Sequence, residues 1–468
     1  MNEKSIFKAF ARAFVVPLLV ISILFSVVGC GCSDVLEAEP LTKNEIAERV
    51  ASDRTERESV VRHIYEWGFP QFNTNKFYYV ESLVEMNFYE KLPSDLTVAT
   101  TLADLFLEYF YDNIPLNDST AVTDAILKCY MASIGDPYAE YRVASEHEAF
   151  MGDVSGGGSF VGVGVLLNKT KEGYPYVITV YKDSGAMAAG MLSGDVILSV
   201  DDKNSITDGY DVTVDALRGE AGTKATVTVL RNGEEIILEV ERRELSEATV
   251  TYFVNEETGY AYVSITSFKM SEGGKKNGTA DEFKAAIDEI EKKNVRGIVF
   301  DLRNNLGGEV GAVVETVSYL VEDGLPVLSY KKGNEYITKR TVVDAHSLNI
   351  PTVVLVNEFT ASAAEIFAAA LRDYRDNSDF ATANKNVTIV GKNTYGKGVS
   401  QSTYLLADGS SVMFTSSYYN PPSGVNYHGV GIAPDEGYEV EYDMDLSGDA
   451  QIKRAYEALD VYFKDLAA

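Results

Sequence analysis

The sequence predicts a multidomain α/β protein with an α-helical N-terminal region, a β-rich middle domain and a mixed α/β core. Three observations predict this organisation. Apolar residues recur at helical spacing over residues 41–153, the period changes to that of strands over 154–244, and strand–loop–helix units alternate over 245–440. Residues 441–468 read as a segment that closes the chain with an amphipathic helix. A length of 468 residues is enough for about three domains.

Residues 1–29 read as an export signal, because a short basic segment precedes the apolar run AFVVPLLVISILFSVV. The run ends at Val27-Val28-Gly29-Cys30, which resembles a bacterial lipobox. We therefore expect cleavage before Cys30 and attachment of acyl chains to this residue, with residues 30–40 as a tether. Acyl chains would hold the protein on the outer face of the bacterial cytoplasmic membrane. An ordinary signal or a short membrane anchor is the alternative.

The composition excludes several classes of partner. The chain has 41 basic and 70 acidic residues, a net charge of −29, which argues against nucleic acid and anionic membrane surfaces as partners. Its 4 histidines and 3 cysteines form no metal-ligand pattern, so we expect no metal and no cofactor. Cys129 lies in a helical pattern and is expected to be a small core residue.

A candidate nucleophile lies in the stretch from Pro351 to Gln401. PTVVLV reads as a buried strand and EIFAAALRDY as a helix with one apolar face, so Ser362 falls in the turn between them. Such turns collect ligands in α/β sheets, and the helix terminus favours negative charge. Ser362-Ala-Ala-Glu365 also fits a capping box, so a purely structural role for the serine is the alternative.

A candidate base follows in YGKGVSQ, where Lys397 lies between two glycines and Gln401 comes four residues later. A lysine can accept a proton from serine if burial lowers its pKa. A solvated loop lysine is the alternative. Residues 391–397 also fit the pattern GxxxxGK, but Gly398 stands where a phosphate-binding loop needs Ser or Thr, which rejects that interpretation. No histidine lies in a motif that pairs it with Ser362, which favours lysine over a Ser-His-Asp triad.

A glycine pair lies at a second strand–helix junction. GIVFDL reads as a strand, and Gly307-Gly308 precede the helix that follows it. Exposed N–H groups here could form an oxyanion hole with the amide of Ala363, the residue after the candidate nucleophile. A tight turn that simply requires glycine is the alternative.

At these three stretches the sequence resembles the C-terminal processing peptidases of family S41, which use a Ser–Lys dyad. The matching segments are DLRNNLGG, NEFTASAAE and YGKGVSQ, with Leu306 where the family usually has proline. The resemblance implies a mixed α/β core of the ClpP/crotonase-like type, Ser362 as nucleophile, Lys397 as general base and Gln401 as its orienting partner. Asp373 matches an acidic position of unassigned role, and residues 374–386 read as an insertion.

Residues 154–244 resemble a PDZ domain, in AMAAGMLSGDVILSVDD and DVTVDALRGEAGTKATVTVLRNG. In such domains an extended peptide joins a sheet edge, and loop N–H groups capture its C-terminal carboxylate. By position, the resemblance implies that the carboxylate loop is Phe160, Val161, Gly162 and Val163, and that Val214 and Leu217 line the groove. SIGDPYAEY resembles the family's link between helix and PDZ domain.

The resemblance as a whole implies a serine endopeptidase that cleaves proteins near their C-termini and binds substrates with free C-termini. It also allows a homodimer formed through the N-terminal helices. A catalytically weak or inactive peptide-binding scaffold is the alternative, supported by Leu306, the reduced A-S-A-A segment and the lengthened Ser–Lys connection. A penicillin-recognising enzyme would need SxxK at the start of a helix, and Ser5–Lys8 and Ser329–Lys332 do not lie there.

Overall fold

The computed structural model describes residues 41–467, apart from 56, 58, 156–158, 182–183, 232, 247, 272–277, 333–334, 342–347, 442–443 and 446–447. The predicted export signal, Cys30 and the tether lie outside the described residues. Within these described ranges, no helix combines the length and the hydropathy needed to cross a membrane.

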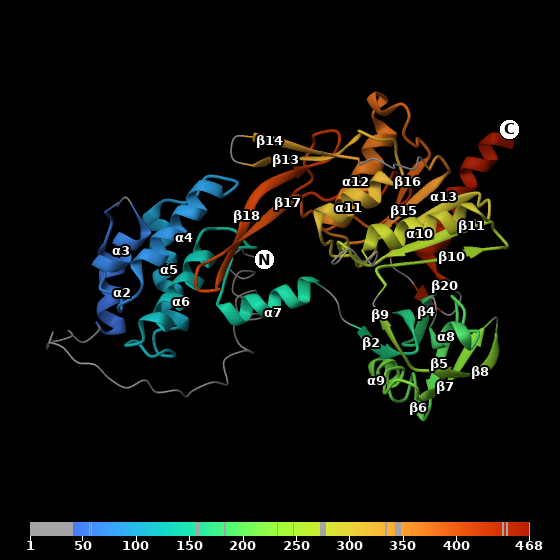
Figure 1. Ribbon diagram of the computed structural model, residues 1–468, viewed down its shortest axis with the longest axis horizontal. Helices are drawn as coiled ribbons and strands as arrows, with labels where there is room; N and C mark the ends of the chain where they lie inside the picture. The colour runs from blue at the N-terminus through green and yellow to red at the C-terminus, as the bar shows by residue number, and fades with distance from the viewer. Residues whose placement is uncertain are drawn as a thin grey trace. The chain divides into compact units, whose positions relative to one another are not determined.

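The N-terminal region is helical, as predicted (Figure 1). Its helices are α2 (Lys43–Ser52), α3 (Val60–Glu66), α4 (Thr74–Asn87), α5 (Asp95–Tyr109) and α6 (Ser119–Ser133). A side-chain oxygen at the N-cap accepts a backbone N–H in all of them except α3, which fixes where these helices begin. Aromatic side chains fill the core between them, with Phe77 against Tyr130 and Phe69 against Phe106. Cys129 is buried in α6, as expected.

After α6 the chain forms a short strand, β1 (Glu140–Arg142), and helix α7 (Ala144–Ser155). β1 pairs antiparallel with β18 (Ser411–Asn420) of the core, through Tyr141 and Val412. The sequence predicts a mainly helical region and a link here, and no strand, because three residues are too few to show a strand period. The N-terminal region therefore contributes an edge strand to a sheet of the core.

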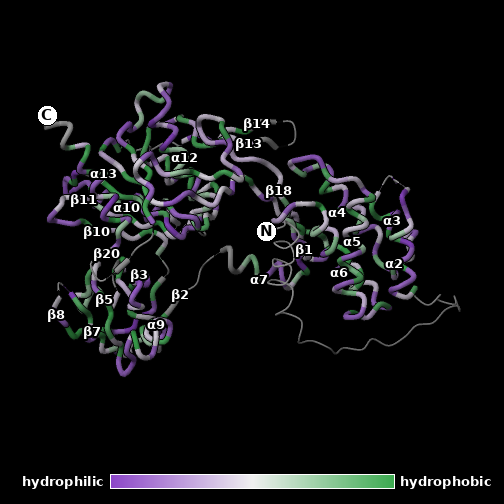
Figure 2. Tube along the Cα trace, turned by 180° about the vertical axis from the view of Figure 1, so that it is seen from behind, coloured by the Kyte–Doolittle hydropathy of each residue, from purple (hydrophilic) through white to green (hydrophobic). Residues whose placement is uncertain are grey.

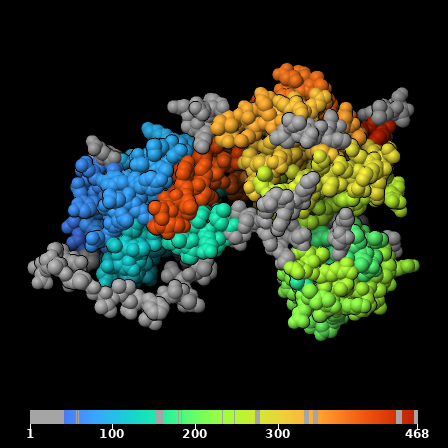
Figure 3. Space-filling view, viewed as in Figure 1, coloured from blue at the N-terminus to red at the C-terminus, as the bar shows by residue number. Residues whose placement is uncertain are grey.

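The middle domain, green in Figure 3, consists mainly of strands, as predicted, and has a hydrophobic core cluster of its own. Its elements are β2 (Ser159–Gly162), β3 (Val165–Lys169), β4 (Pro175–Val180), α8 (Gly185–Ala188), β5 (Val196–Val200), β6 (Lys203–Asn204), α9 (Tyr210–Ala216), β7 (Lys224–Arg231), β8 (Glu234–Glu241) and β9 (Arg243–Ser246). Five strands pair in the order β3-β4-β5-β7-β8, with β6 on β5, and β2 pairs with β9.

The core is built on one mixed sheet in the order β10-β11-β12-β15-β16. Its elements are β10 (Val250–Asn255), β11 (Tyr260–Ile265), α10 (Thr279–Glu291), β12 (Gly297–Asp301), α11 (Val310–Ser318), β15 (Thr352–Val356), α12 (Ala363–Asp376), the 3₁₀ helix η1 (Ser378–Phe380) and β16 (Val387–Gly391). The pairs from β11 to β16 are parallel, and every residue of β12, β15 and β16 is buried. Helices on both faces explain why these strands read as continuous apolar runs.

Alternate residues of the strands face different helices. Phe300 and Val354 pack with α10, α11 and α12, whereas Val299 and Val353 pack with α13 (Ala450–Ala467) on the other face. In Figure 2, green hydrophobic stretches run through the region labelled α10, α12 and α13. The result is a three-layer α/β/α core in which the carboxyl ends of β12 and β15 meet at one edge.

A second sheet carries the strands on either side of the predicted base loop. β13 (Pro326–Lys332), β14 (Glu335–Arg340) and β17 (Val399–Leu405) join β1 and β18 in it, in the order β1-β18-β13-β14 with β17 on β18. Two short strands, β19 (Met444–Asp445) and β20 (Gly448–Asp449), pair before α13. The loop from Lys392 to Gly398 thus connects the first sheet, through β16, to the second, through β17.

Candidate active site

Ser362 lies between β15 and α12, as the sequence predicts, and its backbone is strained. It is the N-cap of α12, with φ 57° and ψ −118°. Residues other than glycine rarely adopt positive φ, and such strain persists only where the surroundings enforce it. Among the described residues, Asn304 on the neighbouring loop shares this property, with φ 61°. Ser362 is half-buried, so this residue of the strained turn remains partly accessible from solvent.

The turn at Gly307-Gly308 lies directly against Ser362. A Cβ at Gly307 would come within 2.8 Å of the Ser362 Cβ and 2.9 Å of the Ala363 nitrogen, and a Cβ at Gly308 would come within 2.1 Å of the Phe268 carbonyl oxygen. Both glycines have positive φ, 105° and 141°. Only glycine allows this close approach, so the turn and the oxyanion-hole predictions for this pair are compatible.

The hydrogen bonds narrow the choice of oxyanion-hole donors. The N–H of Gly307 donates to Oδ1 of Asn305 at 2.8 Å, so this donor is already engaged. Neither Gly308 nor Ala363 donates its N–H in a hydrogen bond between described residues. Gly308 and Ala363 therefore fit the predicted role, and Gly307 serves by allowing the close approach.

Lys397 lies in the loop between β16 and β17, half-buried, and its Nζ lies 4.5 Å from the ring centroid of Tyr138. Burial lowers the pKa of the Lys397 amine below its usual value, and the nearby carboxylates of Asp136 and Glu365 oppose this shift. These observations favour a partly buried lysine over a fully solvated one. In the part of the chain that is described, no hydrogen bond joins Nζ to the Ser362 hydroxyl.

Gln401 does not hold the Lys397 amine in this structure. Its Nε2 donates to Oγ1 of Thr415 on β18 at 3.3 Å, and no hydrogen bond between Gln401 and Lys397 is present among the described residues. The pairing of β17 with β18 shifts register between Ser400 and Gln401. A register shift changes the direction of side chains along a strand, which explains why Gln401 contacts Thr415 in this structure and not Lys397.

Sequence reasoning missed the residues that surround the base. Asp136 and Tyr138 lie in the turn between α6 and β1, in the stretch that reads as a link. The Asp136 carboxylate accepts the N–H of Thr415 at 2.7 Å and its hydroxyl at 3.1 Å. This contact fixes the α6–β1 turn, and with it the Tyr138 ring, beside Lys397. The only signal for it was the unusual run SIGDPYAEY.

Sequence reasoning also treated Glu365 only as part of a capping box. Its side chain is fully buried and accepts the N–H of Ser362 at 2.9 Å and that of Lys397 at 2.8 Å. Burial raises the pKa of this carboxyl, and the hydrogen bonds it accepts act in the opposite direction. Glu365 therefore connects the loop of the candidate nucleophile to the loop of the candidate base.

Exposed apolar side chains surround this group of loops. We call the four of them the rim: Leu306, Phe359, Tyr395 and Val430, which are 72%, 54%, 58% and 73% exposed. Leu306 precedes the glycine pair, and Phe359 lies three residues before Ser362. The N–H of Tyr395 donates to the Thr360 carbonyl at 3.0 Å, and the Val430 carbonyl accepts from Asn393 at 2.8 Å. Three rim residues thus lie on the loops that carry candidate catalytic residues, and Val430 lies on a separate segment that is hydrogen-bonded to one of these loops.

The structure places most of the residues predicted for the peptide-binding loop and groove of the middle domain in a strand or in the domain core. Phe160, Val161 and Gly162 lie in strand β2, paired with β9, rather than in a loop. Val163 and Leu217 are buried in the hydrophobic core of the domain, and the N–H of Val163 donates to the Leu217 carbonyl at 3.2 Å. The assignment of these residues to an open loop and groove was therefore wrong. Val214, half-buried on α9, remains a candidate for the groove.

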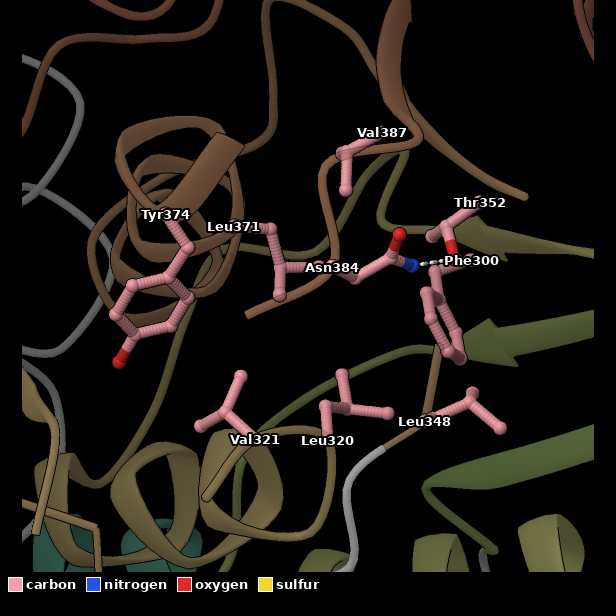
Figure 4. A pocket seen from close by; sticks show the side chains of 9 residues that line it. All are labelled: Phe300, Leu320, Val321, Leu348, Thr352, Leu371, Tyr374, Asn384 and Val387. Atoms are coloured by element: carbon pink, nitrogen blue, oxygen red, sulfur yellow. Dashed lines mark hydrogen bonds between the residues drawn. The ribbon is translucent and has the colours of Figure 1, made fainter. Parts of the chain in front are cut away.

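A small cavity lies elsewhere in the core (Figure 4). Its volume is about 10 Å³, which is room for about one water molecule. Asn384 points into it and donates to Oγ1 of Thr352 at 3.2 Å. None of the candidate catalytic residues lines it. We interpret it as a packing defect of the core. The lining residues are Phe300, Leu320, Val321, Leu348, Thr352, Leu371, Tyr374, Asn384 and Val387.

Comparisons with known proteins agree with this architecture. Residues 259–438 match peptidase family S41, and residues 176–231 match the PDZ domain. The chain is 32% identical over 336 residues to a "Probable CtpA-like serine protease" of Staphylococcus haemolyticus, covering 70% of this chain and 63% of that protein. A relative of the same description from Staphylococcus aureus is 32% identical over 320 residues, covering 68% of this chain and 60% of its own length. The chain thus spans less than two thirds of the length of these relatives.

Among solved structures, the chain is similar to a "photosystem II D1 C-terminal processing protease". The identity is 25% and the TM-score 0.46, and the match covers 83% of this chain and 97% of that one. The tricorn protease is similar at 16% identity and a TM-score of 0.37, over 82% of this chain and 36% of that one.

Proposed function

Because the chain carries a peptidase family S41 domain and a PDZ domain, we propose that it is a serine endopeptidase that cleaves proteins near their C-termini. One observation carries this proposal. Ser362 has a strained backbone, is half-buried and lies against the Gly307-Gly308 turn. The N–H groups of Gly308 and Ala363 make no hydrogen bond among the described residues, and Glu365 joins the Ser362 loop to that of a lysine whose pKa burial lowers.

In the proposed reaction, Ser362 Oγ attacks the scissile carbonyl carbon while Lys397 Nζ takes the hydroxyl proton. The N–H groups of Gly308 and Ala363 stabilise the oxyanion, an effect worth about 3–4 kcal/mol per donor. The protonated Lys397 then gives its proton to the leaving amine, and water hydrolyses the acyl-enzyme. The rim contacts apolar side chains of the substrate near the scissile bond.

Lys397 must turn for this reaction, because in the structure its amine lies on the ring of Tyr138 and has no hydrogen bond to Ser362 among the described residues. A lysine side chain has a flexible four-carbon stem, so rotation about its own bonds can redirect the amine. The orienting role predicted for Gln401 would require the same rearrangement, with release of Thr415. The PDZ domain would bind the substrate tail and deliver it to the site.

The test is hydrolysis of a loosely folded protein with an apolar C-terminus by the full chain in detergent. Ser362→Ala is expected to abolish cleavage, whereas Ser378→Ala, which changes an exposed serine of η1, serves as the matched control. Equal cleavage by wild type and Ser362→Ala would discard the dyad.

A peptide-binding scaffold without turnover is the second candidate. The observation that favours it is the position of the Lys397 amine on Tyr138. It predicts that peptides with a free C-terminal carboxylate bind to the wild-type chain and to Ser362→Ala equally and leave both uncleaved. Mass spectrometry of the peptides after prolonged incubation separates the two candidates.

We further propose that the protein is exported and anchored by acyl chains on Cys30, on the outer face of the bacterial cytoplasmic membrane. The support is the lipobox-like Val27-Val28-Gly29-Cys30 after an apolar run. Incorporation of labelled palmitate in the native host should depend on Cys30 and be lost in Cys30→Ser. Palmitate labelling that persists in Cys30→Ser would contradict the proposal. A homodimer through the N-terminal helices stays a prediction.

A further inference from the structure

A buried carboxylate joins the loops that carry the two proposed catalytic side chains. Glu365, in the first turn of α12, accepts four hydrogen bonds. Its Oε2 accepts the N–H groups of Ser362 at 2.9 Å and Lys397 at 2.8 Å. Its Oε1 accepts the N–H of Gly396 at 2.7 Å and the hydroxyl of Thr394 at 2.6 Å. Both oxygens are thus used fully, by donors from two separate loops.

We propose that Glu365 is a positioning residue that holds the backbone of the Lys397 loop at a fixed place relative to Ser362. The inference rests on the proposed function and adds to it a residue that touches no substrate. A capping role explains only one of the four bonds, the one to Ser362. The other three reach donors 29, 31 and 32 residues away in sequence, in a loop that has no regular secondary structure of its own.

The same carboxylate also maintains the strain at Ser362. The N–H of Ser362 has no partner in α12, because the first N–H groups of a helix lack one. Its bond to Glu365 satisfies this donor while the backbone stays at φ 57°. Hydrogen bonds to an ionised acceptor are stronger than neutral ones, which gives the strained conformation its support.

The chemistry of the four partners makes the proposal testable with an isosteric change. All four are donors, so a carboxylate satisfies them and an amide does not. In Glu365→Gln the amide NH₂ group would face two donors, and those buried groups would be left without an acceptor. The substitution also removes a negative charge that raises the pKa of Lys397.

The experiment compares Glu365→Gln, Glu365→Asp and Asp373→Asn in the full chain. Asp373→Asn is the matched control, because Asp373 is also a buried carboxylate of α12 and accepts the N–H of Ser423 at 2.8 Å. The readouts are kcat and KM for peptide hydrolysis, the pH profile of kcat/KM, and hydrogen exchange of the amides of Ser362, Gly396 and Lys397.

For Glu365→Gln we expect kcat to fall about 100-fold, the effect of a misplacement of about 1 Å at a reacting group, with KM nearly unchanged. The acid limb of the pH profile should move to lower pH, a shift that simple loss of folded protein does not produce. The three amides should exchange faster than in Asp373→Asn. Glu365→Asp keeps the negative charge. Its kcat should be higher than that of Glu365→Gln, and the acid limb of its pH profile should lie at the same pH as in wild type.

Several results would overturn the inference. A kcat for Glu365→Gln equal to that of Asp373→Asn would do so, and so would unchanged exchange of the three amides. The failure of the proposed function looks different: wild type and Ser362→Ala would both leave every peptide uncleaved. The exchange measurement needs no turnover, so it would still decide whether Glu365 joins the two loops.

Discussion

At the scale of single residues, the backbone strain at Ser362 lowers the stability of the fold, whereas the proposed catalytic role depends on the Ser362 hydroxyl. Its φ of 57° and ψ of −118° lie where a side chain costs about 1–3 kcal/mol. Ser362→Gly should remove both the hydroxyl and the strain, and Ser362→Ala only the hydroxyl. We expect both variants to be inactive. Ser362→Gly should be more stable than Ser362→Ala by only about 1 kcal/mol, because the entropy that glycine gains in the unfolded chain offsets part of the relieved strain.

Thermal unfolding of the full chain, followed through the transition of the S41 domain, measures this difference. A Ser362→Gly variant that unfolds at or below the temperature of Ser362→Ala would contradict the idea that the site stores strain.

Lys397 provides a second conflict between activity and stability, one that depends on pH. Burial lowers its pKa in the folded protein, while the unfolded chain keeps the usual value of about 10.4. Between these two values the unfolded chain binds more protons, so stability rises with pH in this window. Below the lowered pKa the full cost of burying the charged amine applies. Lys397→Met removes that cost, and we expect it to lower activity by about 10⁴-fold or more.

The expected result is therefore an inactive variant that unfolds at a higher temperature than wild type near neutral pH. Its advantage should shrink as the pH approaches 10.4, the usual value for lysine. Thermal midpoints over a pH series measure this. An advantage that grows with pH would show that Lys397 is charged and well paired in the fold.

At the scale of elements, a buried ion-pair network fixes the loop after β12 to the start of α13. Arg303 donates to Asp301 at the end of β12, and to Asp449 at 2.7 Å and Gln451 at 2.9 Å near the C-terminal helix. All three charged side chains are nearly inaccessible to solvent. Breaking a buried pair leaves uncompensated charge, so Arg303→Met should lower the free energy of unfolding by about 3–5 kcal/mol.

The control is Lys292→Met, which breaks the exposed pair with Glu289 and should change stability by less than about 1 kcal/mol. Chemical denaturation of both variants gives the comparison. Equal effects would show that the Arg303 network contributes no more than a surface pair.

The elements of the site that could be predicted are those with a local signal. The sequence predicts the strand–Ser362–helix unit and the Gly307-Gly308 turn, because the apolar periodicity, the glycines and the family motif all occur there within a few residues. Glu365 was recognised only as a cap, because its three other partners lie in a loop that sequence spacing cannot place. The contact of Gln401 with Thr415 could not be predicted, because the register shift in β17 has no local signature. Val163 and Leu217 were assigned to the peptide-binding loop and groove, because the sequence alone does not distinguish an apolar residue that lines a groove from one that is buried in a core.

At the scale of the whole molecule, the parts of the site come from regions far apart in sequence. Asp136 and Tyr138 follow the N-terminal helices, Gly308 and Ser362 lie in the first sheet's loops, and Thr415 lies in the second sheet. The pairing of β1 with β18 brings Asp136 and Tyr138 close to the residues of the core. Such contacts span up to 279 positions. Pattern analysis of separate segments predicts the three regions, but not that the N-terminal one completes the environment of the base.

The overall charge gives the last prediction. A net charge of −29 should attract basic segments of a substrate and repel acidic ones before any specific contact forms. Two peptides with the same cleavage segment and C-terminus, but with four lysines or four glutamates at a distant position, should therefore differ in KM and not in kcat. At low salt we expect the basic peptide to have a KM lower by about tenfold, and at 0.5 M salt by about twofold at most, because ions screen charges beyond a few ångströms. Equal KM values at low salt would mean that the charge lies away from the path of the substrate, and a difference that survives high salt would mean direct contacts with the added residues.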